Sequence, residues 1–201
     1  MADFQTRDPR SPAFWDERFD KQFTPWDHGG VPARLRQFVQ DSPAPLRCLI
    51  PGCGSAHELA FMFDAGWDAT AIDFSPAAVA AARIVVGERR AGQVVEADFF
   101  AWQPTAPLDL IYERAFLCAM PRAMRAQVAA RWAQLLAPGA MLAGYFFFDE
   151  HAKGPPFGIT HEQLQELLSP YFECLIDEAV TDSIAVFAGK ERWMVWSRRA
   201  G

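Results

Sequence analysis

The sequence lacks the features of a nucleic-acid-binding protein, a membrane protein or a secreted protein. Its 201 residues include 19 Lys and Arg against 25 Asp and Glu, which gives a formal net charge of −6. Because phosphate binding needs a basic face, nucleic acid is a poor candidate partner. No apolar run reaches the length of a membrane span, and the charged residues 1–15 contain no apolar signal-peptide segment. We therefore expect a cytoplasmic protein.

Metal-binding motifs are also missing. The four cysteines lie far apart and show no metal-type spacing, and none of the four histidines has a metal-like grouping. We expect no metal, and we interpret the cysteines as small buried residues in a reducing compartment. They are Cys48, Cys53, Cys118 and Cys174.

The composition is that of a chain with a sizeable core. Hydrophobic residues make up 51% of the sequence and charged residues 22%, a balance that argues against disorder. No repeat, low-complexity tract or linker interrupts the chain, so we expect one domain over residues 1–201. A monomer is the default at this size.

Strand-like and helix-like patterns alternate from Leu46 onward. Helical patterns cover 57–66, where Gly66 is a stop signal, and 75–90, where Ser75 and Pro76 suit a helix start. A third covers 121–139, which Pro138-Gly139 ends, and a fourth follows Thr160, which forms a possible capping box with Gln163. Strand patterns cover residues 46–50, 67–74, 93–100, 108–115, 140–148, 171–180 and 192–199.

This alternation predicts a Rossmann-like α/β fold. We expect a doubly wound, mostly parallel seven-stranded sheet, with the last strand antiparallel because no helix joins the final two. Residues 1–43 lie outside the alternation. We expect them to form a helical flap or lid, with helices near 12–22 and 31–40 packed over one edge of the sheet.

A ligand site is predicted at the carboxyl ends of the first three strands, where open α/β sheets bind ligands. Gly52 and Gly54 follow the first strand and allow close backbone approach. Asp73, about 20 residues later, suits a pair of ribose hydroxyls. Asp98 ends the third strand, where an adenine would lie. The alternatives are a plain turn for the glycines, a helix cap for Asp73 and a solvated turn residue for Asp98.

The glycine pattern bears on the cofactor. Where the dinucleotide motif G-x-G-x-x-G has its third glycine, His57 stands instead. That glycine permits close helix–strand packing around a pyrophosphate. Its absence favours S-adenosylmethionine over NAD.

Several segments together resemble the thiopurine and thiol S-methyltransferase family of S-adenosylmethionine-dependent enzymes. The similarity covers nearly the whole chain, and the order and spacing of the segments carry it. The segments are FWDERF with TPWDHG, LIPGCGSAHEL, AIDFS, EADFF, LDLIYERAFLCAM and GPPFG. TPWDHG is closer to plant and bacterial thiol or halide methyltransferases, whereas Arg114 is closer to thiopurine methyltransferases.

The resemblance implies roles for matching residues. It implies that Trp15, Phe19 and Trp26 enclose the cofactor and the acceptor, and that Gly52 and Asp73 contact the cofactor. It also implies adenine contacts for Asp98 and Phe99, an active-site position for Arg114 and an acceptor-side loop for residues 154–158. We assign Arg114 and Trp26 to catalysis as well as to cofactor binding.

The aromatic residues suit the cofactor's charge, because aromatic faces attract cations such as a sulfonium. We therefore interpret FTPWDHGG, residues 23–30, as part of a lid. The alternative is that Trp26 only packs the N-terminal helices on the sheet. His28 is a weak candidate for a base.

The expected reaction is in-line methyl transfer to a small soft nucleophile, a thiol or thiopurine-like acceptor in the first place. A nearby cation lowers the pKa of a thiol, and Arg114 is our candidate for it, or for holding an acceptor carboxylate. A salt bridge from Arg114 to Glu113 or another acid is the alternative. Halides, thiocyanate and metalloid anions remain open as acceptors. An NAD-dependent oxidoreductase and a non-enzymatic adenosyl-ligand sensor are the rival classes.

Overall fold

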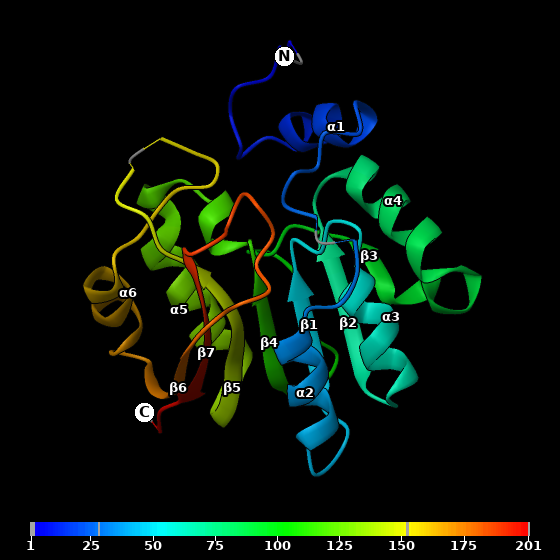
Figure 1. The fold of residues 1–201 in the computed structure, drawn as a ribbon. Coiled ribbons are helices and arrows are strands. Elements are labelled where there is room, and N and C mark those ends of the chain that lie inside the picture. The colour runs from blue at the N-terminus through cyan, green and yellow to red at the C-terminus, as the bar shows by residue number, and fades with distance from the viewer. Residues whose placement is uncertain (1–2, 28, 152, 201) are drawn as a thin grey trace.

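A computed structural model describes residues 3–27, 29–151 and 153–200 and shows one seven-stranded sheet (Figure 1). Strand order is β3-β2-β1-β4-β5-β7-β6. The first five strands run parallel, and β7 pairs antiparallel with both β5 and β6. The predicted fold is thereby confirmed. The strands are β1 Arg47–Pro51, β2 Asp68–Asp73, β3 Val94–Glu96, β4 Leu108–Arg114, β5 Leu136–Phe147, β6 Phe172–Ala179 and β7 Glu191–Arg198.

Helices bury one apolar core on each face of the sheet. On one face, α2, α3 and α4 pack buried residues such as Leu35, Leu59 and Val79 against β1 and its neighbours. On the other face, α5 and α6 contribute Trp132 and Leu164. The helices are α1 Pro12–Asp20, α2 Ala33–Asp41, α3 His57–Asp64, α4 Pro76–Val86, α5 Arg125–Leu135 and α6 His161–Leu168. None formed by the described residues is long and apolar enough to span a bilayer.

Helix starts follow the predicted capping residues. The Ser75 hydroxyl accepts a hydrogen bond from the Ala78 amide at the start of α4. Thr160 and Gln163 form the complete capping box of α6. These local contacts satisfy amides that have no partner inside the helix.

Three predicted boundaries are wrong. Strand β3 stops at Glu96, so Asp98 lies in the turn beyond it. Helix α4 ends at Val86, because Gly87 takes a φ of +76° and a short 3₁₀ helix follows. Pro138-Gly139 lies inside β5, at a register irregularity opposite Leu108 and Leu110, and does not follow the helix.

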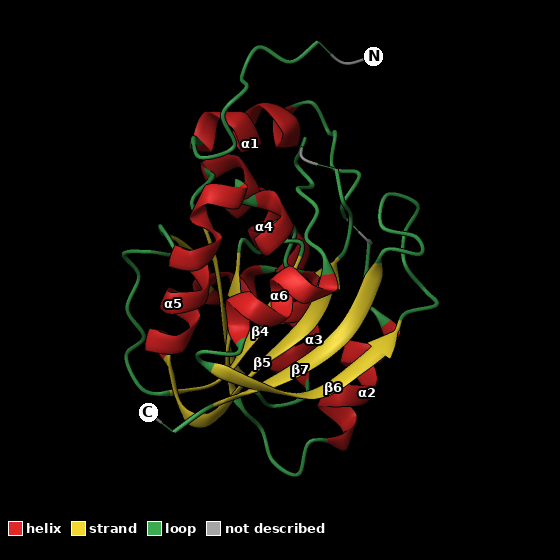
Figure 2. Cartoon of the chain, turned by 90° about the vertical axis from the view of Figure 1, so that its left-hand side faces the viewer, coloured by secondary structure: helices red, strands yellow, loops and turns green. Residues whose placement is uncertain are grey.

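The two N-terminal helices form as predicted but do not share one edge of the sheet. Helix α2 belongs to the face that also carries α3 and α4, because Leu35 and Val39 are buried there. Helix α1 lies beyond the carboxyl ends of the parallel strands and beside α4, at the end of the molecule opposite the C-terminus (Figures 1 and 2). Only α1 is therefore placed to cover a ligand.

Candidate functional site

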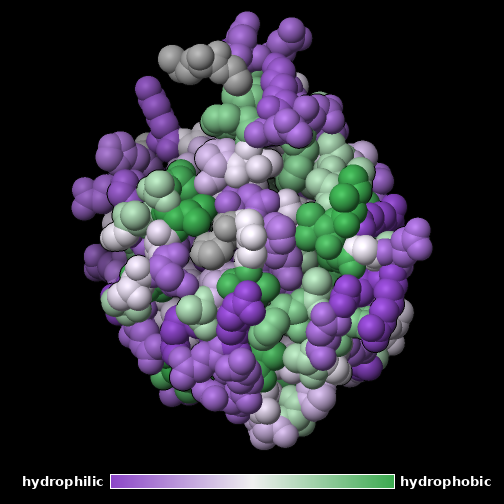
Figure 3. Space-filling model, turned by 45° about the vertical axis from the view of Figure 1, so that its right-hand side comes forward, coloured by the Kyte–Doolittle hydropathy of each residue, from purple (hydrophilic) through white to green (hydrophobic). Residues whose placement is uncertain are grey.

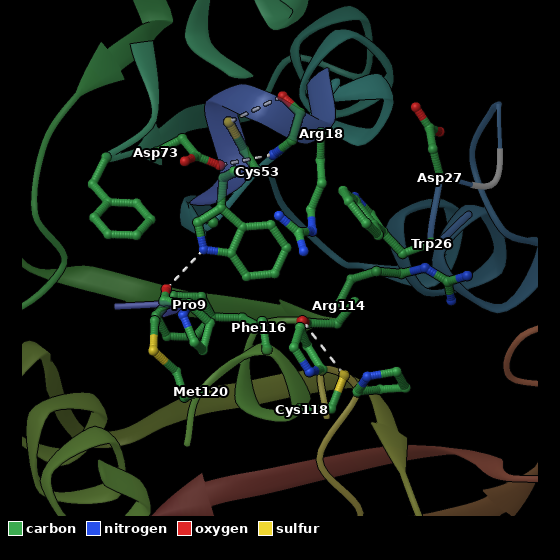
Figure 4. A pocket seen from close by; sticks show the side chains of 18 of the residues that line it. Pro9, Arg18, Trp26, Asp27, Cys53, Asp73, Arg114, Phe116, Cys118 and Met120 are labelled. Carbon is green, nitrogen blue, oxygen red and sulfur yellow. Dashed lines mark hydrogen bonds between the residues drawn. The ribbon is translucent and has the colours of Figure 1, made fainter. Parts of the chain in front are cut away.

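A cavity of about 670 Å³ lies between α1 and the carboxyl ends of β1, β2, β3 and β4. The turns that follow these four strands line it, together with residues 4–30 in part and the loop at 154–156. Figure 4 shows Arg18 pointing into it from α1, opposite Phe116 and Cys118 of the turn after β4. The cavity therefore occupies the position predicted for a ligand.

The turn after β1 depends on its glycines. Gly52 has a φ of +58° and Gly54 a φ of +51°, a region that favours glycine. A Cβ on Gly52 would lie 2.6 Å from Cδ2 of Phe116, and one on Gly54 would lie 3.7 Å from Phe19. Both residues line the cavity, so the turn presents bare backbone to it.

Asp73 closes the same side of the site at the end of β2. Only 8% of the residue is exposed, and its carboxylate accepts hydrogen bonds from the amides of Gly54 at 3.2 Å and Ser75 at 3.0 Å. Burial raises the pKa of Asp73 to about 6. The alternative of a helix cap does not hold, because Ser75 caps α4 and Asp73 lines the cavity.

Asp98 and Phe99 reach the cavity in different ways. Asp98 is exposed and accepts a hydrogen bond from the Phe100 amide at 2.9 Å, which is the predicted turn alternative. Phe99 is 5% exposed, and its ring centroid lies 4.9 Å from that of Phe116. Phe99 is thus a core residue that also borders the cavity, and Asp98 lies at its rim.

Trp15, Phe19 and Trp26, which we call the lid aromatics, form one cluster over the glycine turn. Ring centroids of Trp15 and Trp26 are 5.4 Å apart, and those of Phe19 and Trp26 are 6.1 Å apart. The Trp15 indole donates a hydrogen bond to the Pro9 carbonyl at 2.8 Å (Figure 4). All three are half-buried and line the cavity. Trp26 also packs against a small core that contains Cys118 and Phe187, so its contacts are not limited to the N-terminal helices and the sheet.

Two aspartates connect the segments that carry this cluster to the turns after β1 and β2. Asp27 accepts a hydrogen bond from the Ser55 hydroxyl at 2.5 Å, and its other oxygen lies 3.2 Å from Nε2 of His57. Asp16 accepts hydrogen bonds from the Ser75 hydroxyl and the Ala77 amide at the start of α4. His28, the weak candidate base, lies outside the described residues.

Arg114 ends β4 and faces the cavity. Its Nη1 atom lies 3.4 Å from Oε1 of Glu191, and its guanidinium carbon lies 4.4 Å from the Tyr145 ring centroid. Both terminal nitrogens are buried and make no hydrogen bond to the described residues. The salt-bridge alternative is therefore met by another acid, Glu191, and not by Glu113, because neighbouring residues of a strand point to opposite faces. Glu113 instead accepts a hydrogen bond from the Leu117 amide at 3.2 Å.

Sequence reasoning missed several residues of the cavity wall. Arg18 belongs to the motif FWDERF and points into the cavity, and its guanidinium carbon lies 3.2 Å from the Phe14 ring centroid. Burial lowers the pKa of Arg18. Glu58 and Tyr112 lie inside segments that we interpreted only as a helix and a strand. Their positions, in the first turn of α3 and two residues before Arg114, were the available signal.

Two cysteine thiols also border the cavity, Cys53 in the glycine turn and Cys118 after β4 (Figure 4). Burial raises the pKa of both well above the usual range. Among the described residues, no three His, Cys, Asp or Glu side chains are grouped to hold a metal ion.

Charges of the two signs enter the cavity from different elements. The segment between α1 and α2, helix α3, the end of β2 and the turn after β3 contribute carboxylates, whereas β4, α1 and the residues before α1 contribute guanidinium groups. The cavity is therefore acidic toward β2, β3 and α3 and basic toward β4 and the N-terminal segment. The carboxylates are those of Asp27, Glu58, Asp73 and Asp98, and the guanidinium groups those of Arg7, Arg10, Arg18 and Arg114.

Comparison with known proteins agrees with this geometry. The profile of the family described as Thiopurine S-methyltransferase (TPMT) matches residues 10–199. Thiocyanate methyltransferase 1 of Arabidopsis thaliana is 30% identical over 190 residues, which cover 92% of this chain and 84% of that protein. A thiopurine S-methyltransferase of Shewanella piezotolerans (strain WP3 / JCM 13877) is 28% identical over 81% of this chain and 83% of that protein.

Solved structures show the same fold. One is the Burkholderia thailandensis 1,6-didemethyltoxoflavin-N1-methyltransferase, with its substrate and S-adenosylhomocysteine bound. It superposes with a TM-score of 0.74 at 16% identity, over 99% of this chain and 94% of that chain.

Proposed function

This chain belongs to the thiopurine S-methyltransferase family and is an S-adenosylmethionine-dependent methyltransferase, and on this basis we propose that its acceptor is a small anionic soft nucleophile, a thiolate in the first place. Family membership argues against the two rival hypotheses, an NAD-dependent oxidoreductase and a non-enzymatic sensor. The observation that carries the proposed acceptor is the buried guanidinium of Arg114 at the cavity wall.

The cavity residues fit the cofactor. Gly52 and Gly54 carry no side chains and take positive φ angles, so their backbone borders the cavity directly. Asp73 would accept hydrogen bonds from the ribose hydroxyls, and Asp98 and Phe99 would border the adenine. Residues that we assign to cofactor binding are Trp15, Phe19, Trp26, Gly52, Gly54, Asp73, Asp98, Phe99 and Arg114.

When bound, S-adenosylmethionine supplies a methyl group on a sulfonium, which a nucleophile displaces in line. The lid aromatics line the cavity, and aromatic ring faces attract a cation by about 0.5 to 2 kcal/mol. Trp15, Phe19 and Trp26 also exclude water from the cavity. Exclusion of water favours a reaction in which opposite charges cancel, since water stabilises the separated charges more.

Arg114 would hold and activate the acceptor. A cation near a thiol lowers its pKa, so the thiolate, which is the nucleophile, is present at neutral pH. The two terminal nitrogens that make no hydrogen bond to described residues suit an anionic sulfur or an acceptor carboxylate. Arg114 thus sets the charge of the acceptor, and the walls of the cavity set its orientation.

Thiocyanate, halides and metalloid anions stay as the second candidate class. A relative named a thiocyanate methyltransferase supports it, because its similarity covers 92% of this chain. The same guanidinium would bind such anions. A cavity of about 670 Å³ has room for both classes beside the cofactor.

We also propose that residues 1–201 form one cytoplasmic, monomeric domain in which α1 and its neighbouring loops act as the lid; the expected lid over residues 1–43 is too long, because α2 packs on the sheet. All four cysteines are free, as expected in a reducing compartment. On the face shown in Figure 3, hydrophobic side chains form small separate patches among polar ones. Size-exclusion chromatography with light scattering would test the monomer.

Replacement of Arg114 by Ala tests the acceptor proposal. We expect the acceptor's KM to rise by about tenfold or more, since a hydrogen bond to a charged group contributes about 1.5–3 kcal/mol. The affinity for S-adenosylhomocysteine should fall by a clearly smaller factor, since Arg114 is only one of the residues assigned to the cofactor. The assay measures S-adenosylhomocysteine release with aromatic thiols, hydrogen sulfide, thiocyanate and iodide.

Arg89→Ala is the matched control, because Arg89 is exposed on the 3₁₀ helix after α4 and does not line the cavity. Equal loss of acceptor and cofactor affinity in the Arg114 variant would refute the role given to Arg114. Turnover of iodide or thiocyanate in preference to every thiol would select the second class.

A further inference from the structure

We propose that Glu58 and Tyr112 form a binding site for the α-ammonium group at the methionyl end of the cofactor. The inference rests on the cofactor position given above and is independent of the choice of acceptor. It adds a cation-binding subsite on α3 and β4 to the glycine turn and Asp73.

Glu58 is a carboxylate at the cavity wall that has no partner side chain among the described residues. It lies in the first turn of α3, is 8% exposed and lines the cavity. The other cavity carboxylates, Asp27, Asp73 and Asp98, each accept hydrogen bonds from other residues. Glu58 accepts none from another described residue; its one hydrogen bond is from its own amide.

Tyr112 supplies the second polar group. Its side chain is fully buried in β4, its hydroxyl has no hydrogen-bond partner among the described residues, and it lines the same cavity. Tyr112 and Arg114 point to this side of the sheet because they are two residues apart on one strand. A buried polar group without a partner is costly unless a ligand or water satisfies it.

Glu58 and Tyr112 together suit a ligand group that is positively charged and donates hydrogen bonds. The amino end of α3 stabilises the Glu58 carboxylate, although burial raises the pKa of Glu58. A bound cation would offset the cost of that burial. The adenosine of the cofactor is assigned to Asp73 and Asp98, so its primary ammonium is the donor that remains for Glu58.

A purely structural role would make Glu58 the counter-ion of Arg114. The geometry argues against this, because the acid that pairs with Arg114 is Glu191, 3.4 Å away. No Lys, Arg or His nitrogen of the described residues lies within 4.0 Å of the Glu58 carboxylate.

The test compares S-adenosylhomocysteine with its deamino analogue, in which hydrogen replaces the α-amino group, by isothermal titration calorimetry. The wild-type protein should bind S-adenosylhomocysteine more tightly than the analogue. Glu58→Gln should weaken S-adenosylhomocysteine by about 10-fold to 100-fold, which corresponds to one hydrogen bond to a charged group. The same variant should bind the analogue within about twofold of wild type, so that the preference disappears.

Tyr112→Phe removes only the hydroxyl and should reduce the same preference by a smaller factor. Glu113→Gln is the matched control, because Glu113 is also a buried carboxylate and follows Tyr112 on β4, but faces away from the cavity. It should keep the wild-type preference. Circular dichroism checks that each variant is folded.

The inference is overturned if Glu58→Gln weakens both ligands by the same factor or leaves the affinity for S-adenosylhomocysteine unchanged. If that variant does not fold, an unchanged preference in Tyr112→Phe overturns it. Titrations contain no acceptor, so their outcome is separate from that of the thiol panel. A wild-type protein that methylates no thiol would refute the proposed acceptor and leave the ammonium site standing.

Discussion

The Asp16 carboxylate of α1 accepts a hydrogen bond from the Ser75 hydroxyl at 2.6 Å, and the same oxygen accepts one from the Ala77 amide at 3.1 Å. Asp16 follows the lid aromatic Trp15. The Ser75 amide donates a hydrogen bond to Asp73, the residue proposed to bind the ribose. Helix α1 is therefore fixed directly to the cofactor side of the site.

We expect Asp16→Ala to loosen α1 and weaken S-adenosylhomocysteine binding by about tenfold, which corresponds to the loss of hydrogen bonds to a charged group. The maximal rate with a saturating acceptor should fall less. Calorimetry and steady-state kinetics measure both quantities. Asp20→Ala is the control, because Asp20 is exposed near the end of the same helix. Equal effects of the two substitutions would contradict a specific role for Asp16.

Cofactor affinity should depend on pH through Asp73, whose burial raises its pKa to about 6. An ionised carboxylate accepts hydrogen bonds from ribose hydroxyls, so the bound state favours the ionised form. Affinity for S-adenosylhomocysteine should therefore be constant above about pH 7 and fall by up to about tenfold per pH unit below about pH 6.

Titration calorimetry between about pH 5 and pH 8 checks this dependence. Asp73→Asn should bind more weakly and show a flatter profile over the acidic range. An equally steep profile in Asp73→Asn would assign the titration to a different group.

Glu113 should make the folded state less stable at alkaline pH. Burial raises its pKa from 4.5 to about 8, so the folded protein holds this proton more tightly than the unfolded chain. Stability from Glu113 is present below pH 4.5 and is lost as pH rises from 4.5 toward 8. The slope is at most about 1.4 kcal/mol per pH unit.

Glu113→Gln removes the titration but keeps an oxygen that accepts from the Leu117 amide. The free energy of unfolding of the variant minus that of wild type should increase between about pH 6 and pH 9. Urea denaturation at both values measures this difference. A constant difference would show that the carboxyl does not titrate in this range.

Local chemistry explains why most of the fold was predictable. Apolar strand runs, the cap at Ser75 and the capping box at Thr160 depend on neighbours in the chain, and all appear in the structure. The start of β5 was not predictable from Pro138-Gly139. It depends on the pairing of Leu136 with Leu108, a contact between distant segments.

The candidate site divides in the same way. Gly52, Gly54, Asp73 and Arg114 stand at strand ends, which a pattern of alternating strands and helices locates. Glu58 looked like an ordinary helix residue, and its burial against the cavity follows from how α3 packs beneath the glycine turn. Glu191 is the partner of Arg114 because β7 inserts beside β5, an arrangement that no local pattern predicts.

The raised pKa values of Cys53 and Cys118 bear on how the enzyme avoids alkylating itself. Both sulfur atoms border the space assigned to a reactive methyl donor, yet each keeps its proton at physiological pH and is a poor nucleophile in that form. Under the role proposed for Arg114, an incoming thiol beside it would lose its proton in the same cavity. The difference in protonation would then direct the methyl group to the acceptor sulfur and spare Cys53 and Cys118.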